Sequence, residues 1–424
     1  MSTKIAGLAR YLARRQRFIP RSIVWVVFFS WWDRLARIGA VRADPPPRVL
    51  FVRVDLLGDL ALQAPWLGAM AAVADDRGWA VDLLCNQAAS RVLQPLLPAS
   101  VRLIPVDRNG FVTRPWYRLR VLRQLCRTRY ASLVQLGWSR DLLWLDALAA
   151  IVPADEKIAL ESDLRNQSSF QRLLGDLFYT RKVVVPPDAV FHGNANRVLA
   201  EAVIAQWTGT ATARPTVMTG VAGGKDDNLS PHTIFKDHYY LIFPGASTAT
   251  KRWPAERFAE LIDRLGEYTS WQPVLAGAPT ETEIAHRIVQ SASTKVTNLA
   301  GRIPPDALMR WIQRAQCLIG NDSGPAHLGA LAGTPVVAVV GGGDFGRFFP
   351  YPKDYSPLRD TVVTAYRALP CYGCQWTCSH PERRNGTAFP CIDQITVQQV
   401  LDAVKTIIPA DGNAGPRPIQ DGIR

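Results

Sequence analysis

The stretch Cys317-Leu-Ile-Gly-Asn-Asp-Ser-Gly-Pro-Ala-His-Leu-Gly-Ala-Leu-Ala332 decides the fold class of this 424-residue chain. Its first residues, 317–320, form an apolar run of the kind found in buried strands, and residues 324–332 have the pattern of a helix. A polar loop that contains glycine joins the two. A buried strand that passes through such a loop into a helix is the repeating unit of a parallel sheet covered by helices.

The same alternation extends in both directions from this stretch. The second half of the chain has predicted strands at 239–243, 272–276, 297–299, 317–320 and 336–340. The first half has predicted strands at 48–54, 80–85, 101–106 and 131–136. Residues 155–235 are harder to interpret, although 194–207 have the pattern of a helix. Residues 219–230, rich in Gly, Asp and Asn, resemble an interdomain linker. We therefore predict an α/β protein with two Rossmann-like domains, at 48–230 and 231–408, and a flexible tail at 409–424.

The charge of the chain favours anionic partners. Lys and Arg number 49 against 36 Asp and Glu, which gives a net charge of +13. Such an excess suits nucleic acid, acidic lipid or phosphorylated glycan, although a basic surface without a specific role is also possible. Because no helix-turn-helix, zinc-finger or RNA-binding aromatic motif is present, we expect no nucleic-acid partner.

An N-terminal arm, residues 1–47, holds much of this excess. The apolar run Ile23 to Trp32 is flanked by arginines, and three prolines, 45–47, follow as a stiff spacer. An apolar run of this length between cations suits a helix in the membrane interface, and the alternative is an extra helix packed on the first domain. No signal-type cleavage site follows, and no stretch reaches the ~18 apolar residues that span a bilayer. We expect a cytoplasmic protein, peripheral on the anionic inner face of the cytoplasmic membrane.

Three loops at predicted strand ends carry the candidate chemistry, because parallel α/β sheets bind ligands at the carboxyl ends of their strands. The first is Arg53-Val-Asp55-Leu-Leu-Gly58-Asp59, in which Asp59 is either a general base or a helix N-cap. In the second, after Phe243, Ser247 and Lys251 can hold phosphate oxygens, although Lys251 and Arg252 can also be a solvated basic pair.

The third motif, Gly320 to His327, opens a helix whose amides form an anion site suited to a diphosphate. Its Asp322, Ser323 and His327 can contact the ligand or hold the shape of the loop. A glycine run, 341–343, follows the next strand and permits either close approach to a ligand or a plain turn.

Together, these motifs resemble those of glycosyltransferase family 9, the ADP-heptose:lipopolysaccharide heptosyltransferases. The similarity covers roughly residues 48–404. The matching blocks are R-x-D-x-x-G-D at 53–59, P-G-A…K-R-W-P-x-E-x-F-A-x-L at 244–261, G-x-P-x-E at 277–281 and D-S-G-x-x-H at 322–327. The chain departs from the family where a Thr-Pro is usual, since Ala64-Pro65 stands there, and in its extra N-terminal arm.

The resemblance implies the GT-B fold, with two Rossmann-like domains facing across a cleft, and inverting transfer without a catalytic metal. It implies a sugar, heptose from ADP-heptose, moved onto lipopolysaccharide or another lipid-linked or cell-surface glycan. The implied catalytic base is Asp59, with Asp55 as the alternative carboxylate. The implied donor contacts are Ser247, Lys251, Glu281, Asp322, Ser323, Gly324 and His327. A relative that uses another nucleotide sugar or modifies a protein, and a non-catalytic protein that binds sugar nucleotides, remain alternatives.

Four late cysteines have the spacing of a metal site: Cys371, Cys374, Cys378 and Cys391. Four thiolates so spaced can close around one tetrahedral ion, for which zinc is the default. Some protein-modifying relatives in the resembled family carry iron at four cysteines, which keeps iron open. Two disulfides or free thiols are the alternatives, and disulfides are disfavoured in the cytoplasm. An ion with four protein ligands would be structural.

Overall fold

The computed structural model describes residues 29, 31–38, 47–210, 215, 231, 238–353, 355, 361–384 and 386–408. The predicted linker at 219–230, the tail at 409–424 and most of the N-terminal arm lie outside the described residues. The chain forms two compact units. The first contains the chain up to Leu56 and Gln63–Thr216, and the second contains Leu57–Leu62 and the chain from Val217 onward.

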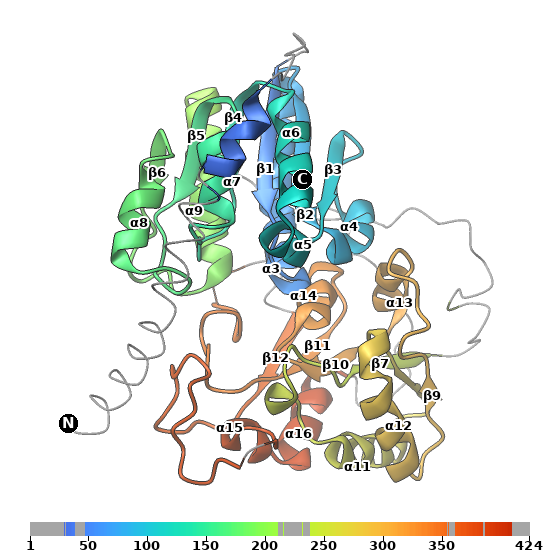
Figure 1. The fold of residues 1–424 in the computed structure, drawn as a ribbon. Coiled ribbons are helices and arrows are strands. Elements are labelled where there is room, and N and C mark those ends of the chain that lie inside the picture. The colour runs from blue at the N-terminus through green and yellow to red at the C-terminus, as the bar shows by residue number, and fades with distance from the viewer. Residues whose placement is uncertain are drawn as a thin grey trace. The chain divides into compact units, whose positions relative to one another are not determined.

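The first unit is built on a six-stranded sheet in the order β3-β2-β1-β4-β5-β6 (Figure 1). Every neighbouring pair of strands is parallel. The strands are β1 (Arg48–Arg53), β2 (Ala80–Asn86), β3 (Val101–Val106), β4 (Tyr130–Gln135), β5 (Ala154–Leu160) and β6 (Arg181–Val183). Because β1 and β2 are buried almost throughout, their near-continuous apolar runs fit a sheet covered on both faces.

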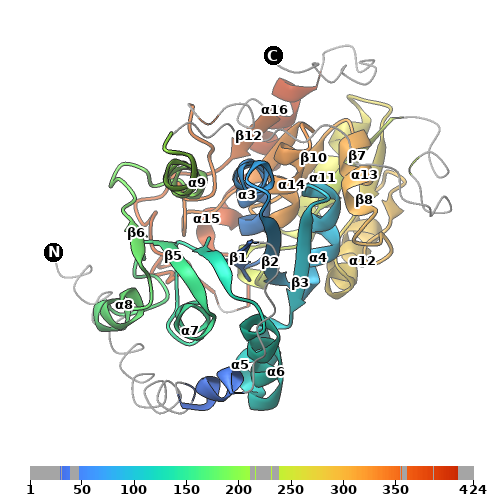
Figure 2. The same cartoon turned by 90° about the horizontal axis from the view of Figure 1, so that it is seen from above.

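Helices cover both faces of this sheet. In Figure 2, α3 and α9 lie on one face, and α6 and α7 lie on the other. The helices are η1 (Leu35–Arg37), α3 (Leu57–Asp76), α4 (Gln87–Leu93), η2 (Gln94–Leu96), α5 (Arg108–Thr113), α6 (Pro115–Cys126), α7 (Leu145–Ile151), α8 (Ser169–Asp176) and α9 (His192–Thr208). Among the described residues, only α3 is long and apolar enough to cross a membrane, and 72% of its most apolar window is buried. That burial is typical of the central helix of an α/β unit.

The second unit repeats the design with the order β12-β11-β10-β7-β8-β9, again all parallel. The strands are β7 (Tyr239–Phe243), β8 (Gln272–Leu275), β9 (Thr297–Asn298), β10 (Leu318–Asn321), β11 (Val336–Val339) and β12 (Val362–Ala365). Counted within each unit, both sheets have the Rossmann order 3-2-1-4-5-6. The predicted α/β class with two Rossmann-like domains is confirmed.

The helices of the second unit lie on both sides of its sheet, with α11, α12 and α16 below it and α13 and α14 above it in Figure 1. The helices are η4 (Ala249–Lys251), α11 (Ala255–Gly266), η5 (Pro279–Glu281), α12 (Thr282–Ser291), α13 (Leu308–Arg314), α14 (Gly324–Leu331), α15 (Pro390–Asp393) and α16 (Val397–Ile407). One apolar core joins α11, α12 and α16 to the sheet.

The strand order singles out one position in each sheet. In the second unit the chain runs β7, β8, β9 in one direction and then returns to place β10 on the other side of β7. Loops that leave adjacent strands in opposite directions open a crevice at the carboxyl edge, where open α/β sheets bind their ligands. The loops after β7 and β10 contain Lys251 and Asp322, so two of the three candidate loops meet at this switch point.

The described part of the N-terminal arm packs on the first unit. Asp33 is buried and pairs with Arg118 of α6 at 2.5 Å. The indole of Trp32 donates to the carbonyl of Pro115 at 3.1 Å, and Arg37 donates to that of Ile151 at 2.8 Å. Residues 31–38 therefore pack on the first unit. Most of the apolar run Ile23 to Trp32 lies outside the described residues, so its placement in the membrane interface or on the first domain stays a prediction.

Candidate active site

Asn321, at the end of β10, ties the two switch-point loops together. Its side chain is fully buried, and its Oδ1 accepts a hydrogen bond from the backbone N–H of Trp253 at 3.0 Å. Its Nδ2 donates to the carbonyls of Pro244 and Gly245, at 2.8 and 3.2 Å. Sequence reasoning did not single out Asn321, although a polar residue that closes an apolar strand was a usable signal.

Lys251 contacts an aromatic ring and is under the electrostatic influence of two carboxylates. It ends η4, and its Nζ is 3.9 Å from the centre of the Trp376 ring. Burial lowers the pKa of Lys251, and the charges of Asp322 and Asp344 act to raise it. The ammonium is thus partly withdrawn from water at the carboxyl edge of β7, where an anion would find it poorly screened.

Asp322 follows β10 directly. Burial raises the pKa of its carboxyl group to about 7, the positive charge of Lys251 lowers it, and the charges of Asp344 and Asp59 raise it. A carboxyl group with a pKa near 7 is only partly ionised at neutral pH. Such a group can give up its negative charge when an anion approaches.

Ser323 and Gly324 form the start of α14. Ser323 occupies the N-cap position, but its hydroxyl donates to the carbonyl of Asn321 at 3.1 Å instead of capping the helix. Gly324 packs against the start of α3, which groups with the second unit: a Cβ on Gly324 would lie 3.2 Å from the backbone N of Gly58. The small residues at this helix start therefore allow close approach of backbone to backbone.

His327 is buried within an aromatic stack. Its ring lies 4.3 Å from that of Phe349, and its Nδ1 shares a hydrogen bond with the hydroxyl of Tyr351 at 2.7 Å. Burial lowers the pKa of His327 to about 3, so the imidazole is neutral at physiological pH. It brings no positive charge to a diphosphate, and its packing supports the alternative that it holds the shape of the loop.

Glu281 lies at the end of η5, after β8. Its Oε2 accepts a hydrogen bond from the backbone N–H of Ala278 at 2.8 Å. A Cβ on Gly245 would lie 1.7 Å from Glu281 Oε1, so only glycine leaves room for this carboxylate at the end of β7. Ser247, in the same loop, is exposed. The structure thus gathers Ser247, Lys251, Glu281 and Asp322 at one edge of the second sheet.

Asp59 and Asp55 differ in their surroundings. Asp59 is the third residue of α3, whose N-cap position is held by Leu56, so Asp59 is a first-turn acid and not the N-cap. Asp55 pairs with Nε of the buried Arg53 at 2.8 Å, and Arg53 also contacts His192 at 2.9 Å. Asp55 therefore has a structural role, as the ion-pair partner of the buried Arg53.

The glycine run 341–343 accommodates side chains of the cysteine segment. A Cβ on Gly342 would lie 2.1 Å from the ring of Tyr372, and one on Gly343 would lie 2.2 Å from that of Trp376. The backbone N–H groups of Gly373 and Gln375 donate to the carbonyls of Gly342 and Gly343 at 2.8 and 2.9 Å. Neither reading from the sequence, ligand approach or a plain turn, included this packing role.

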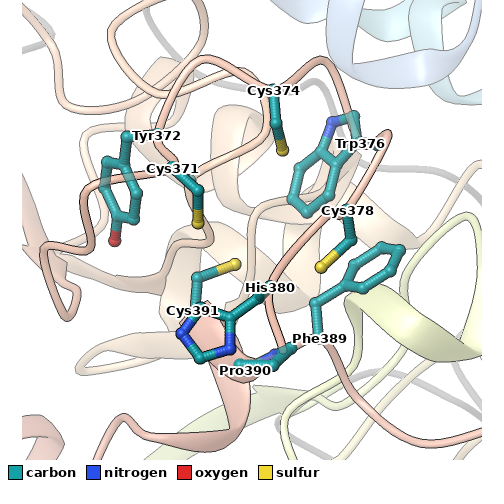
Figure 3. A pocket seen from close by; sticks show the side chains of 10 residues that line it. Cys371, Tyr372, Cys374, Trp376, Cys378, His380, Phe389, Pro390 and Cys391 are labelled. Atoms are coloured by element: carbon teal, nitrogen blue, oxygen red, sulfur yellow. The ribbon is translucent and has the colours of Figure 1, made fainter. Parts of the chain in front are cut away.

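The four late cysteines line one pocket in the second unit, together with His380 (Figure 3). All four are free thiols in the structure, as are Cys85, Cys126 and Cys317. Burial raises the pKa of Cys374 and of Cys391, and the charges of neighbouring thiolates of the cluster raise both further. Within the described residues, however, no group of three or more His, Cys, Asp or Glu side chains is arranged to hold a metal ion. The predicted structural zinc or iron is therefore not supported by this arrangement.

Comparison with known proteins places the chain among glycosyltransferases. Residues 118–374 match the family model described as glycosyltransferase family 9 (heptosyltransferase). That range contains Lys251, Glu281 and the loop after β10, but not Asp59.

Among curated proteins, lipopolysaccharide heptosyltransferase 3 of Escherichia coli (strain K12) is 34% identical over 188 residues, which cover 44% of this chain and 51% of the relative. Lipopolysaccharide heptosyltransferase 2 of the same strain is 27% identical over 173 residues, covering 39% and 45%. The chain thus spans about half the length of the curated relatives it matches.

Solved structures show the same fold. A glycosyltransferase of family 9 from Veillonella parvula DSM 2008 superposes with a TM-score of 0.66 at 20% identity, covering 86% of this chain and 98% of that one. The E. coli heptosyltransferase WaaC with ADP superposes with a TM-score of 0.55 at 21% identity, covering 85% and 96%. Since the family model covers more than half of the residues, this chain belongs to glycosyltransferase family 9.

Proposed function

We propose that the chain transfers heptose from ADP-heptose to a lipopolysaccharide acceptor. The observation that carries this proposal is the placement of Lys251 and the start of α14 at the switch point between β7 and β10. A lysine and a helix N-terminus at such a crevice suit a diphosphate. The relatives are named lipopolysaccharide heptosyltransferases, and one related structure contains ADP-2-deoxy-2-fluoro heptose, which supports this donor.

The other proposed donor contacts lie at the same edge of the second sheet. Glu281, which follows β8 next to β7, would contact the nucleoside end of the donor. Asp322 would stand beside the diphosphate, and its pKa of about 7 lets it take up a proton as the anion binds. Lys251 would then stabilise the negative charge that develops on the leaving diphosphate.

The proposed transfer inverts the anomeric carbon. The acceptor hydroxyl attacks this carbon from the face opposite the diphosphate, the new carbon–oxygen bond forms as the bond to phosphate breaks, and ADP leaves with the electron pair. Asp59 takes the hydroxyl proton. Burial is the main cause of the raised pKa of Asp322, and the charge of Asp59 adds a smaller contribution, which supports a place for Asp59 near the donor.

The test measures transfer and binding together. Incubation with ADP-heptose and lipopolysaccharide lacking the terminal heptose should release ADP and add one heptose by mass spectrometry. Thermal shifts with ADP-heptose, other nucleotide sugars and an oligonucleotide should show stabilisation by ADP-heptose above all. Transfer only from another nucleotide sugar, or only to a protein, would replace the proposed substrates, and ADP-heptose binding without any transfer would favour a non-catalytic protein.

We propose further that the four late cysteines bind one zinc or iron ion. The reason for this proposal is that all four thiols line one pocket, although their side chains would have to move to close around one ion. Four thiolates complete a tetrahedral site and leave no position for substrate, so the ion would stabilise the segment that packs on Gly342 and Gly343.

We also infer that the protein acts at the inner face of the cytoplasmic membrane. One tryptophan of the arm and one of α6 support this: Trp31 is 67% exposed, and Trp116, which contacts Trp32 of the arm, is 74% exposed. Because the arm supplies the buried partner of Arg118, deleting it would destabilise the first unit.

A sharper test is Trp31→Ser with Trp116→Ser in the full chain, which should lower sedimentation with vesicles of phosphatidylglycerol and phosphatidylethanolamine. Unchanged sedimentation would exclude this surface as the membrane contact.

A further inference from the structure

Trp376 links the cysteine segment to Lys251. Its ring faces the Lys251 ammonium at 3.9 Å, and its indole N–H donates to Oδ2 of Asp344 at 2.7 Å. Trp376 lies between Cys374 and Cys378 in the chain and lines the same pocket as they do (Figure 3). One residue outside the family motifs thus contacts the cation on which the proposed donor site depends.

The backbone around Trp376 has an uncommon conformation. Gln375 and Trp376 have φ values of 50° and 62°, in the left-handed region that residues other than glycine rarely adopt. Two hydrogen bonds hold the segment, from Gln375 N–H to the carbonyl of Gly343 and from Thr377 N–H to that of Cys374, both at 2.9 Å. Strained residues persist where the surroundings fix them, and they gather at functional sites.

We propose that Trp376 is a positioning residue that holds Lys251 ready for the donor diphosphate. The inference rests on the proposed function, because it assigns Trp376 to the same donor site. Trp376 itself contacts no reacting atom and acts through Lys251, while Asp344 orients the indole.

The physical reason is the flexibility of the lysine side chain. A lysine ends in a point charge on a four-carbon stem and loses considerable rotamer freedom when it is ordered. A ring that already restricts the ammonium before the donor arrives reduces the ordering that binding must impose, which increases affinity. The attraction between cation and ring, in a half-buried position, supplies that restriction.

A double-mutant cycle tests the proposal, with ADP as the probe and calorimetry as the measurement. Trp376→Leu should weaken ADP binding by about 3- to 30-fold, the range expected for a partly desolvated cation–ring contact. In a chain that already carries Lys251→Ala, Trp376→Leu should change ADP affinity little. Trp376→Phe keeps a ring but loses the N–H that meets Asp344, so its affinity should fall between those of the wild type and Trp376→Leu.

Tyr372→Leu is the matched control. Tyr372 comes from the same segment and packs on Gly342 as Trp376 packs on Gly343, so its loss also disturbs the packing of the segment on the glycine run. We expect it to keep ADP affinity within about twofold of wild type. Three results would overturn the inference and leave the donor site intact. ADP affinity could stay at the wild-type level in Trp376→Leu. The losses of ADP affinity could add fully in the double variant, or Tyr372→Leu could lose as much ADP affinity as Trp376→Leu. Wild-type affinity in Lys251→Ala would instead overturn the proposed donor site itself.

Discussion

The side chain of Asn321 accepts a hydrogen bond from the backbone N–H of Trp253 at 3.0 Å and so joins the end of β10 to the loop after β7. Both residues are fully buried. Trp253 in turn donates from its indole to the carbonyl of Ile395 at 2.9 Å. The two candidate donor loops are therefore held by one amide inside the core, and their separation depends on it.

Asn321→Ala should destabilise the second unit and weaken donor binding together. The change leaves the N–H of Trp253 and the carbonyls of Pro244 and Gly245 buried without this partner, at a cost of about 1–3 kcal/mol. Chemical denaturation measures the loss. Ser323→Ala removes a single hydrogen bond at a half-buried site and should cost less than about 1 kcal/mol. Equal losses in the two variants would contradict the role given to Asn321.

The sequence predicted the switch-point loops well, because their residues follow apolar strands in a regular strand–helix alternation. Strand β5, helix α8 and strand β6 were not predicted, because their burial departs from simple patterns. Several residues of β5 are only partly buried, α8 exposes Phe170 and Leu173, and Leu177, which follows α8, is also exposed. Strands at the edge of a sheet, and the helix that joins them, lack the long apolar runs by which the central strands are recognised in the sequence.

The glycines at 341–343 are required by side chains that lie about 30 positions later in the chain. Nothing near Gly343 in the sequence indicates that the ring of Trp376 occupies the space of its missing side chain. The contact between Lys251 and Trp376 was likewise beyond local patterns, since 125 positions separate these residues along the chain. Motifs identify which residue types bind phosphate, whereas the packing that positions them is a property of the tertiary structure.

Lys251→Ala should weaken ADP binding and lower kcat/KM for the donor. A hydrogen bond to a charged group contributes about 1.5–3 kcal/mol, so the expected loss is roughly 10- to 150-fold. Arg252→Ala is the control, because the guanidinium of this neighbouring cation donates to the carbonyl of Ala246 at 3.4 Å. If both variants lose affinity equally, general charge and not the position of Lys251 attracts the donor.

The free energy of unfolding of the ligand-free protein should depend on pH because Asp322 titrates. The pKa of Asp322 in the folded protein, about 7, lies above the ordinary value of 3.8 for an aspartate, so folding favours the protonated form. Its contribution to stability is therefore fully present below about pH 4 and is lost as the pH rises through 7. Asp322→Asn should become progressively more stable than wild type over that window, by at most ~1.4 kcal/mol for each pH unit, and level off above it.

Asp263→Asn is the control with the opposite sign. Burial acts to raise the pKa of Asp263, but hydrogen bonds from the backbone N–H groups of Ser293 and Thr294 outweigh it and lower the pKa. Its contribution is present above pH 4 and is lost as the pH falls. Thermal melts from about pH 2 to 8 measure both slopes, since that of Asp263 lies below pH 4 and that of Asp322 above it. A flat difference between Asp322→Asn and wild type would show that Asp322 keeps its ordinary pKa.

Protein purified without added metal should contain about one zinc or iron ion per chain if the four late cysteines bind as proposed. Cys374→Ser should remove most of that metal, because it takes one of four thiolates from the set. Cys317→Ser is the control, since Cys317 is a buried thiol of the strand region outside the pocket. Metal-free wild-type protein with four titratable thiols in the cluster would refute the proposal.

Asp59→Asn should separate the chemistry of transfer from the folding of the first turn of α3. Asn keeps the shape of the side chain but does not take up a proton from the acceptor hydroxyl. A missing general base typically costs ~10²–10⁴-fold in rate, whereas an acid in the first turn of a helix contributes only about 0.3–1 kcal/mol of stability. We therefore expect a folded variant that binds ADP-heptose normally and transfers heptose at least ~100-fold more slowly.

Asp55→Asn provides the comparison that makes this result decisive. Asp55 pairs with the buried Arg53 at 2.8 Å, so its loss leaves a buried guanidinium with one fewer counter-charge and should lower stability first. The two variants should thus differ in kind: Asp59→Asn slow but stable, Asp55→Asn less stable with a smaller loss in kcat. A slow, fully stable Asp55→Asn beside a fast Asp59→Asn would transfer the role of base to Asp55, because proton transfer then depends on the carboxylate that pairs with Arg53.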